Sequence, residues 1–184
     1  MTKKIFMVVM RRVLFIFALC LAAITTQAQA KLGYFIEGNI QISPKQHGLT
    51  ALADNLIAGI EPVENLRVMF DLSGMLGLYN KEGVKTYYQT SVALGGGLGY
   101  RVWTNKKTNG LFAGRDAVDV RAIFTTTAGK PDWKYNNYSI GLTLYDRDSH
   151  KISPTLGIGY HYIKSRTPGI SNQSNVYFEI GLRI

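Results

Sequence analysis

The chain has 184 residues, with 21 Lys and Arg against 12 Asp and Glu, and a formal net charge of +9. Four of the cations lie in the first 12 residues; without them 17 cations remain, and the charge falls to about +5. This weak excess does not favour a nucleic-acid partner. The single cysteine, Cys20, excludes an intramolecular disulfide and a cysteine-based metal site.

Residues 1–30 have the three parts of a secretory signal peptide. Basic residues open the segment, an apolar run covers residues 13–24, and Ala28-Gln29-Ala30 forms a small-x-small cleavage site. The alternative is an N-terminal membrane anchor, but about 12 apolar residues are too few for a bilayer that needs roughly 20. Leu19 before Cys20 also does not fit a lipoprotein signal. We therefore expect residues 1–30 to be cleaved and residues 31–184 to form one domain exported across the inner membrane.

The exported part alternates apolar and polar residues with period two, which predicts strands. In the last stretch, for example, Phe178 and Ile180 fall on one side and Glu179 on the other. An eighth strand is expected at 51–60, where alternation is poor, because the gap needs one and turn residues flank it. The seven clearer stretches are 32–42, 66–76, 91–102, 118–125, 138–145, 152–162 and 175–184. The sequence thus predicts an all-β, antiparallel, up-and-down, eight-stranded barrel.

The apolar faces of these strands allow two barrels. A soluble barrel would turn them inward, whereas an outer-membrane barrel would turn them to lipid. Strands of about 10 residues can cross a membrane at a tilt. The connections at 61–65 and 146–150 are short, those at 43–50, 80–85, 128–134 and 164–174 are mostly longer, and 104–115 breaks the rule. The pattern favours a transmembrane β-barrel with short periplasmic turns and longer extracellular loops.

The polar faces carry matched charges, and every cation among them is Arg. An eight-stranded barrel has room only for side chains, and Arg pairs with carboxylates in two-point contacts, so this set suits ion pairs that plug the lumen. The alternative is a soluble sheet with a wet polar face. The predicted lumen residues are Glu37, Arg67, Asp71, Arg101, Asp119, Arg121, Glu179 and Arg183.

Aromatic residues near the strand ends suggest the two belts expected at membrane interfaces. We place Tyr34, Tyr100, Trp103 and Tyr145 in the periplasmic belt. The loop-side belt would hold Tyr79, Tyr88, Trp133, Tyr135 and Tyr162.

The sequence contains little that indicates a catalytic or metal site. The three histidines, His47, His150 and His161, have no ligand spacing, so no metal or other cofactor is expected. His161 with Ser165 and Glu179 could form a hydrolase triad. We expect His161 to point inward instead, so the sequence predicts no enzyme. The Gly95–Gly99 run lacks the helix and Lys of a phosphate loop, and we expect it to let the barrel bend.

Cations gather in or beside the longer loops. Beside a lipopolysaccharide they would neutralise its phosphates, whereas the alternative is ordinary solvated charge. The loop cations are Lys45, Lys81, Lys85, Lys130, Lys134, Lys164 and Arg166.

With its signal peptide, strand count, alternation and terminal strand, residues 31–184 resemble the small eight-stranded outer-membrane barrels of the OmpA/OmpX type, a porin-like β-barrel domain. Ile184 departs from the Phe or Trp that usually ends such chains. The resemblance implies a monomer in the Gram-negative outer membrane, assembled by the barrel-assembly machinery and surrounded by lipid and lipopolysaccharide. A structural or surface-interaction role is expected, with a narrow channel as the alternative and a lipid-A-modifying enzyme as a more distant one.

Overall fold

A computed structural model describes residues 33–44, 46, 49–79, 87–107, 110–112, 114–147 and 152–184. The predicted cleavage residues Ala28 and Ala30 lie outside this part, as do the loop residues Lys45, Lys81 and Lys85. His47 and His150 lie outside it too.

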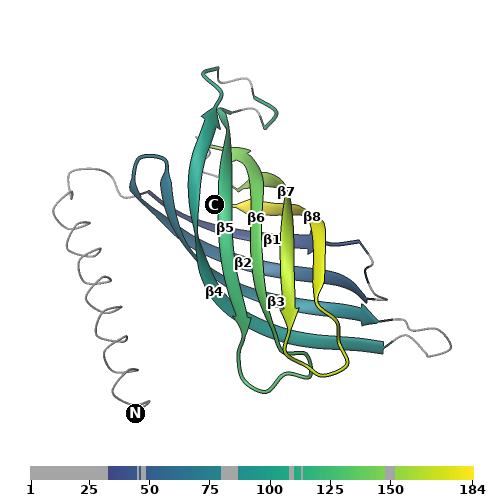
Figure 1. Ribbon diagram of the computed structural model, residues 1–184. Helices are drawn as coiled ribbons and strands as arrows, with labels where there is room; N and C mark the ends of the chain where they lie inside the picture. Colours follow the sequence, from purple (N-terminus) through teal and green to yellow (C-terminus); the bar gives the residue numbers. More distant parts are fainter. Residues whose placement is uncertain are drawn as a thin grey trace, which may run out of the picture. The chain divides into compact units, whose positions relative to one another are not determined.

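Eight β-strands account for the regular structure of the described residues (Figure 1). The prediction of eight strands is confirmed, including the poorly alternating second strand, which runs over 15 residues. Each strand covers its predicted core, and most extend beyond it at one or both ends. The strands are β1 (Gly33–Ile42), β2 (Leu49–Val63), β3 (Leu66–Tyr79), β4 (Tyr87–Thr104), β5 (Asp116–Thr127), β6 (Tyr135–Asp146), β7 (Ser153–Ser165) and β8 (Gln173–Arg183).

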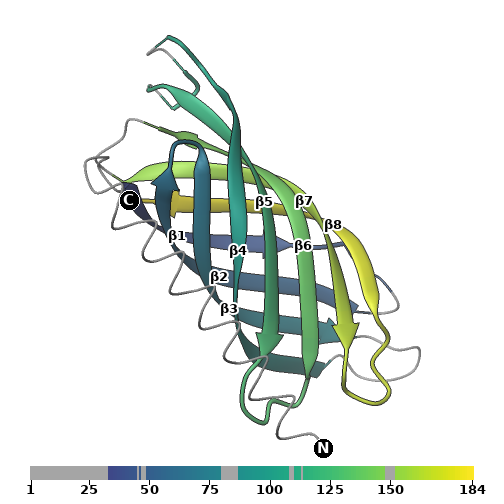
Figure 2. The same ribbon diagram turned by 60° about the vertical axis from the view of Figure 1, so that its left-hand side comes forward.

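The strands form a closed, antiparallel, up-and-down barrel in the order β1 to β8. Closure comes from β1 and β8, which pair from Glu37 opposite Arg183 to Ile42 opposite Phe178. The strands run obliquely around the barrel, and β4 curves most visibly along its wall (Figures 1 and 2). Closure satisfies the backbone groups of both would-be edges, so the barrel has no free sheet edge.

The two ends of the barrel hold different connections, but connection length does not separate them, because 105–115, the longest, lies at the same end as the two-residue β2–β3 turn. The turn end holds the start of β1, the end of β8 and the β2–β3, β4–β5 and β6–β7 connections; the loop end holds the other four connections. At the turn end, β2 and β3 are joined by Glu64 and Asn65 alone. Asn65 has a φ of 68°, and its backbone N–H donates to Glu61 Oε1 at 3.0 Å. Asn tolerates this left-handed conformation, which explains how so short a turn closes.

The polarity of the barrel is inside out. In β1, alternate residues from Phe35 are buried, and the residues between them are exposed. The exposed set is mainly aliphatic and aromatic: Phe178 is 56 % exposed, and Ile140 and Leu98 lie on the same outer wall. The interior contains most of the charged strand residues. A soluble barrel of this size would have the opposite arrangement, since burial of apolar surface drives its folding.

One charged residue interrupts this outer wall well inside a strand. Asp54 of β2 is exposed, and its carboxylate covers Gly74 of β3, where a Cβ would lie 2.4 Å from Asp54 Oδ1. Gly74 therefore gives the carboxylate a place against the backbone. Asp54 lies five residues from the loop end of β2.

Close approach between strands explains the glycine run. A Cβ on Gly95 would lie 1.9 Å from the carbonyl oxygen of Phe124, and one on Gly97 would lie 2.2 Å from that of Ala122. No side chain larger than hydrogen fits there without moving β4 away from β5. These contacts support the steric role predicted for the run.

Within the described residues, no helix is long and apolar enough to cross a membrane.

Candidate functional site

An ion pair spans the whole width of the lumen. Arg121 of β5 donates from Nη1 to Glu37 Oε1 at 2.7 Å and from Nη2 to Oε2 at 2.9 Å. In a ring of eight strands, β1 and β5 are four strands apart and lie opposite each other. Both side chains are buried, Glu37 completely. This two-point contact therefore joins opposite walls of the barrel across the interior.

Further towards the turn end, two more Arg residues share one cluster of acceptors. Arg67 pairs with Asp119 in a close contact, while Arg101 Nη2 donates to Glu61 Oε2 at 2.7 Å. Arg67 Nη2 lies 3.5 Å from the same Glu61 oxygen. Glu61 thus joins β3 and β4 to β2, and the cluster links four strands.

Tyr145 of β6 lies at the centre of this cluster. Its hydroxyl accepts from Arg67 Nη2 at 2.6 Å and from Arg101 Nε at 2.9 Å, and it donates to Asp119 Oδ1 at 2.9 Å. The side chain is buried. Its assignment to an outward aromatic belt is therefore wrong: the alternation of β6 points Tyr145 inward, and the cluster satisfies its hydroxyl.

The last predicted cation, Arg183, is held between two rings and makes no ion pair within the described part of the chain. Its guanidinium carbon lies 4.0 Å from the centroid of Phe35 and 4.2 Å from that of Tyr145. Arg67 approaches the same two rings at 5.4 and 4.6 Å. Phe35 fits because Gly59 has no side chain, whose Cβ would lie 2.3 Å from the ring. The aromatic faces attract both cations.

The remaining two predicted lumen anions are buried outside the ion pairs of the described residues. Glu179 accepts from Thr143 Oγ1 at 2.7 Å and from Gln41 Nε2 at 3.0 Å. Asp71 is buried, and its Oδ1 has no hydrogen-bond partner among the described atoms. The structure thus brings Glu37, Arg67, Arg101, Asp119 and Arg121 into ion pairs, and places Asp71, Glu179 and Arg183 in the lumen without them.

The loop end of the lumen is packed with apolar side chains. Trp133 and Tyr135 are fully buried, with ring centroids 5.0 Å apart, and Ile163 of β7 is buried against them. The placement of Trp133 and Tyr135 in a lipid-facing belt is therefore wrong. The other members of this apolar cluster are Ala51, Ala53, Met75 and Ala93.

Other belt residues do face outward. Tyr34, Tyr100, Trp103 and Tyr162 are exposed, while the side chains of Tyr79 and Tyr88 lie outside the described atoms. A register shift between Arg101 and Trp103 turns Trp103 to the outer wall, although both are odd-numbered. The predicted belt at the turn end is thus incomplete. Of the three described residues of the predicted loop-side belt, Tyr162 is exposed and the other two are buried.

His161 is buried in the lumen beside a different serine from the one expected. Its Nε2 lies 3.2 Å from Ser43 Oγ, and its ring centroid lies 5.6 Å from that of Tyr177. Ser165 donates to the carbonyl oxygen of Thr167, and Glu179 binds Thr143 and Gln41. The described contacts do not connect His161 with Ser165 or Glu179, so the alternative triad arrangement is not formed, whereas the predicted inward orientation of His161 is confirmed. In the described part of the chain, no group of three His, Cys, Asp or Glu could hold a metal ion.

Four of the loop cations lie in the described residues, and all four are exposed: Lys130, Lys134, Lys164 and Arg166. Two are tied to each other, since the backbone N–H of Arg166 donates to the carbonyl oxygen of Lys134 at 2.6 Å. This hydrogen bond brings the β5–β6 and β7–β8 loops together.

Among the ion pairs given for the described residues, Glu61 is the member that the sequence did not predict. It precedes Pro62 and falls in the predicted 61–65 turn, so it was assigned to a connection. A register shift between Ile60 and Val63 directs its carboxylate towards Arg101. A bulge of this kind leaves no signature in apolar periodicity.

These features define a class: a small, closed, eight-stranded antiparallel β-barrel with an ionic interior and an apolar exterior. No protein-family model, curated protein or solved structure matches the chain.

Proposed function

We propose that the chain is an integral outer-membrane β-barrel of the OmpA/OmpX type, with a structural or surface-interaction role. The inverted polarity carries this proposal: the exterior is apolar, whereas Glu37, Asp119 and Arg121 are buried inside. Lipid is the solvent that favours such an exterior, and closure pairs the backbone groups that lipid could not satisfy. The signal-like segment 1–30 supports export. We further propose that the protein acts as a monomer and is not an enzyme.

The turn end would face the periplasm and the loop end the exterior. The direction follows from the usual outer-membrane arrangement, in which both termini are periplasmic. The two-residue β2–β3 turn agrees with this direction, whereas the 105–115 connection at the same end is longer than those at the loop end. The exposed cations Lys130, Lys134, Lys164 and Arg166 would then face the lipopolysaccharide layer.

The test compares gel mobility before and after boiling, using outer-membrane fractions of a Gram-negative bacterium that expresses the full chain. Folded outer-membrane barrels keep a different mobility until boiled, so a heat-modifiable band in the membrane fraction is expected. A chain that stays soluble in the periplasm would contradict the proposal.

A pair of substitutions makes the test specific to the outer wall. Ile158 is exposed at the middle of β7, whereas Leu111 is exposed in the β4–β5 connection. In lipid, Ile158→Arg should cost about 2–4 kcal/mol and reduce the folded band, while Leu111→Arg leaves it unchanged. Equal tolerance of both changes would indicate that water surrounds the wall.

The narrow-channel alternative has a separate readout. Because the Arg121–Glu37 pair joins opposite walls, the barrel should be electrically silent in planar bilayers. Discrete conductance that changes when Arg121 or Arg183 is neutralised would establish the channel instead. The enzyme alternative predicts altered lipid A acylation that His161→Ala abolishes, and unchanged lipid A on overexpression is the result that we expect.

A further inference from the structure

A hollow of about 430 Å³ lies on the outer wall over β4 to β7. Its floor is made of small residues: Gly96 has no side chain, and Ala122 lies between Leu98 and Ile140 in the register of β4, β5 and β6. Larger side chains rise around this floor. Those that surround it are Leu98, Phe124, Tyr138, Ile140, Tyr160 and Tyr162.

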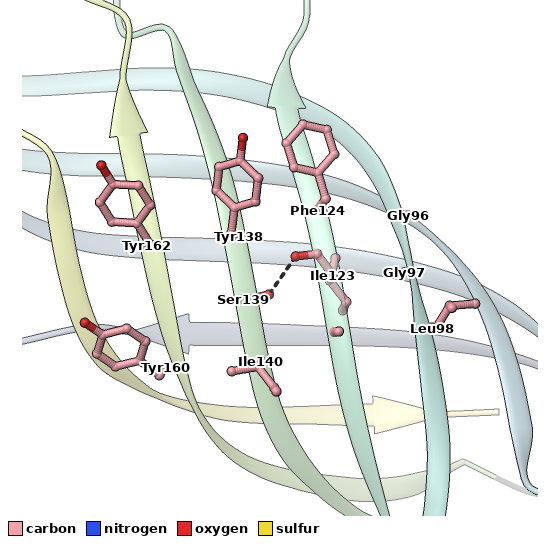
Figure 3. Close-up of a pocket in the computed structure, with 11 residues that line it drawn as sticks. Gly96, Gly97, Leu98, Ile123, Phe124, Tyr138, Ser139, Ile140, Tyr160 and Tyr162 are labelled. Carbon is pink, nitrogen blue, oxygen red and sulfur yellow. Dashed lines mark hydrogen bonds between the residues drawn. The ribbon is translucent and has the colours of Figure 1, made fainter. Parts of the chain in front are cut away.

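Three rings form the edge of the hollow towards the loop end. Phe124, Tyr138 and Tyr162 lie side by side on β5, β6 and β7 (Figure 3). The Phe124 and Tyr138 centroids are 5.0 Å apart, and those of Tyr138 and Tyr162 are 6.3 Å apart. Such a row offers an apolar face below and hydroxyl groups at its rim, which suits a membrane interface.

Cations lie immediately beyond this row. The next outward residues along the three strands are Thr126, Asn136 and Lys164. Arg166 is anchored over them, since its Nη2 donates to Thr126 Oγ1 at 3.1 Å and to Thr127 Oγ1 at 2.7 Å. Within the described part of the chain, all hydrogen bonds of this exposed guanidinium come from Nη2. Nε and Nη1 therefore remain available to an anion.

A second hollow, of about 450 Å³, continues the first towards the middle of the wall. The two share Ile140 and Tyr160, and the second extends to Leu142 and Ile158. From Tyr162 to Ile158 the two hollows cover four residue steps along β7, or about 13 Å at the usual strand rise. One leaflet of the hydrocarbon core is about 15 Å thick, so the two hollows could accommodate acyl chains along their length.

We propose that this groove binds lipopolysaccharide, with a lipid A phosphate on Arg166 and Lys164 and acyl chains in the two hollows. The proposal rests on the outer-membrane location proposed above, which places the loop end in the leaflet that contains this lipid. Charge complementarity favours a phosphorylated lipid. Lys134 adds a third cation to the rim, and against these three cations stands one neighbouring acidic residue in the described part of the β5–β6 loop, Asp132. The adjoining hollows favour a lipid with several acyl chains over one with two.

Native mass spectrometry of the folded chain in detergent micelles tests the proposal. The probes are bisphosphorylated lipid A, the same lipid without phosphates, phosphatidylglycerol and phosphatidylethanolamine. Lipid A should bind most tightly, and the double variant Lys164→Gln/Arg166→Gln should bind it about tenfold more weakly, because charge-assisted hydrogen bonds are lost. Arg147→Gln, an exposed change at the turn end, is the matched control and should bind like the unchanged protein.

A second pair of variants tests the hollow itself. Ala122→Phe fills the floor and should also weaken lipid A binding about tenfold, whereas Ala58→Phe, on the outer wall of β2, should not. Equal binding of phosphorylated and dephosphorylated lipid, equal binding of phosphatidylglycerol, or no effect of either pair would overturn this site. The heat-modifiable band of each variant is recorded in parallel. A barrel that enters the membrane without selective binding contradicts only the lipid site, while a barrel that stays out of the membrane contradicts the proposed function.

Discussion

The two halves of the lumen both hold buried side chains but differ in chemistry. At the turn end, charges from β1 to β5 and the Tyr145 hydroxyl of β6 form one ionic cluster. At the loop end, Trp133, Tyr135 and Ile163 pack in an apolar cluster, and the polar contact between His161 and Ser43 is buried in the same half. The interior is therefore stabilised mainly by geometry-dependent pairs at one end and mainly by shape-filling packing at the other.

The difference shows how each half should respond to change. Ion pairs that cross the lumen are costly to break, because a buried charge without its partner is not solvated. Apolar packing depends on volume and tolerates small changes in proportion to the space they leave.

The largest effect is expected at the pair that spans the lumen. Arg121→Met leaves Glu37 buried without its main partner and should lower the free energy of unfolding by about 3–5 kcal/mol. The double change Arg121→Met/Glu37→Leu should be less damaging than the single one, since no charge is stranded. Urea unfolding of the barrel in lipid vesicles measures both. Additive losses would mean that the two side chains do not depend on each other.

A smaller effect is expected at the centre of the ionic cluster. Tyr145→Phe keeps the ring beside Arg183 but removes the hydroxyl that Arg67, Arg101 and Asp119 share. The loss should be about 1–3 kcal/mol in the same unfolding assay, because the partners are buried. A loss below 0.5 kcal/mol, the range of ordinary surface changes, would contradict the central place of Tyr145.

At the apolar end, a substitution that shortens a buried side chain should lower the free energy of unfolding by less. Ile163→Val removes one methylene from the buried cluster and should cost about 0.5–1.5 kcal/mol. Ile140→Val, the same change on the outer wall, is the control and should cost less because Ile140 is exposed. If the outer change costs more than the inner one, Ile163 does not belong to a packed core.

The smallest effect is expected on the loops. Lys130→Gln removes an exposed cation and should change the free energy of unfolding by no more than about 0.5 kcal/mol. The unfolding midpoint of the variant should match that of the unchanged protein. A shift as large as that of Ile163→Val would reveal an interaction between Lys130 and the barrel.

The strands and their faces were predictable because alternation with period two depends only on neighbouring residues. The same rule points Tyr135 and Tyr145 inward, yet their position near strand ends suggested a belt; alternation proved the stronger indicator. Partners were harder to predict. Nothing in the sequence links Arg121 to Glu37 across the lumen, because that contact depends on how the closed barrel brings β5 opposite β1.

The ion pairs of Glu61 and the hydrogen bonds of the Arg166 guanidinium could not be predicted from the sequence. The bulge that turns Glu61 inward and the loop contacts that hold Arg166 over Thr126 are set by tertiary structure. The sequence indicates one of the small residues in the floor of the outer hollow, since Gly96 belongs to the glycine run. Its neighbours on β6 and β7 become evident only in the register of the sheet.

The most direct test of the inside-out polarity uses the two tryptophans of the chain. Trp103 is 50 % exposed on the outer wall, and Trp133 is 0 % exposed in the lumen. The barrel is inserted into vesicles whose acyl chains carry bromine near the interface, and tryptophan quenching is compared between the unchanged protein and Trp103→Phe. We predict that the unchanged protein loses the share of its emission that comes from Trp103, and that Trp103→Phe, which retains only Trp133, shows almost no quenching. Equal quenching in both, or none in either, would contradict an apolar wall in contact with lipid.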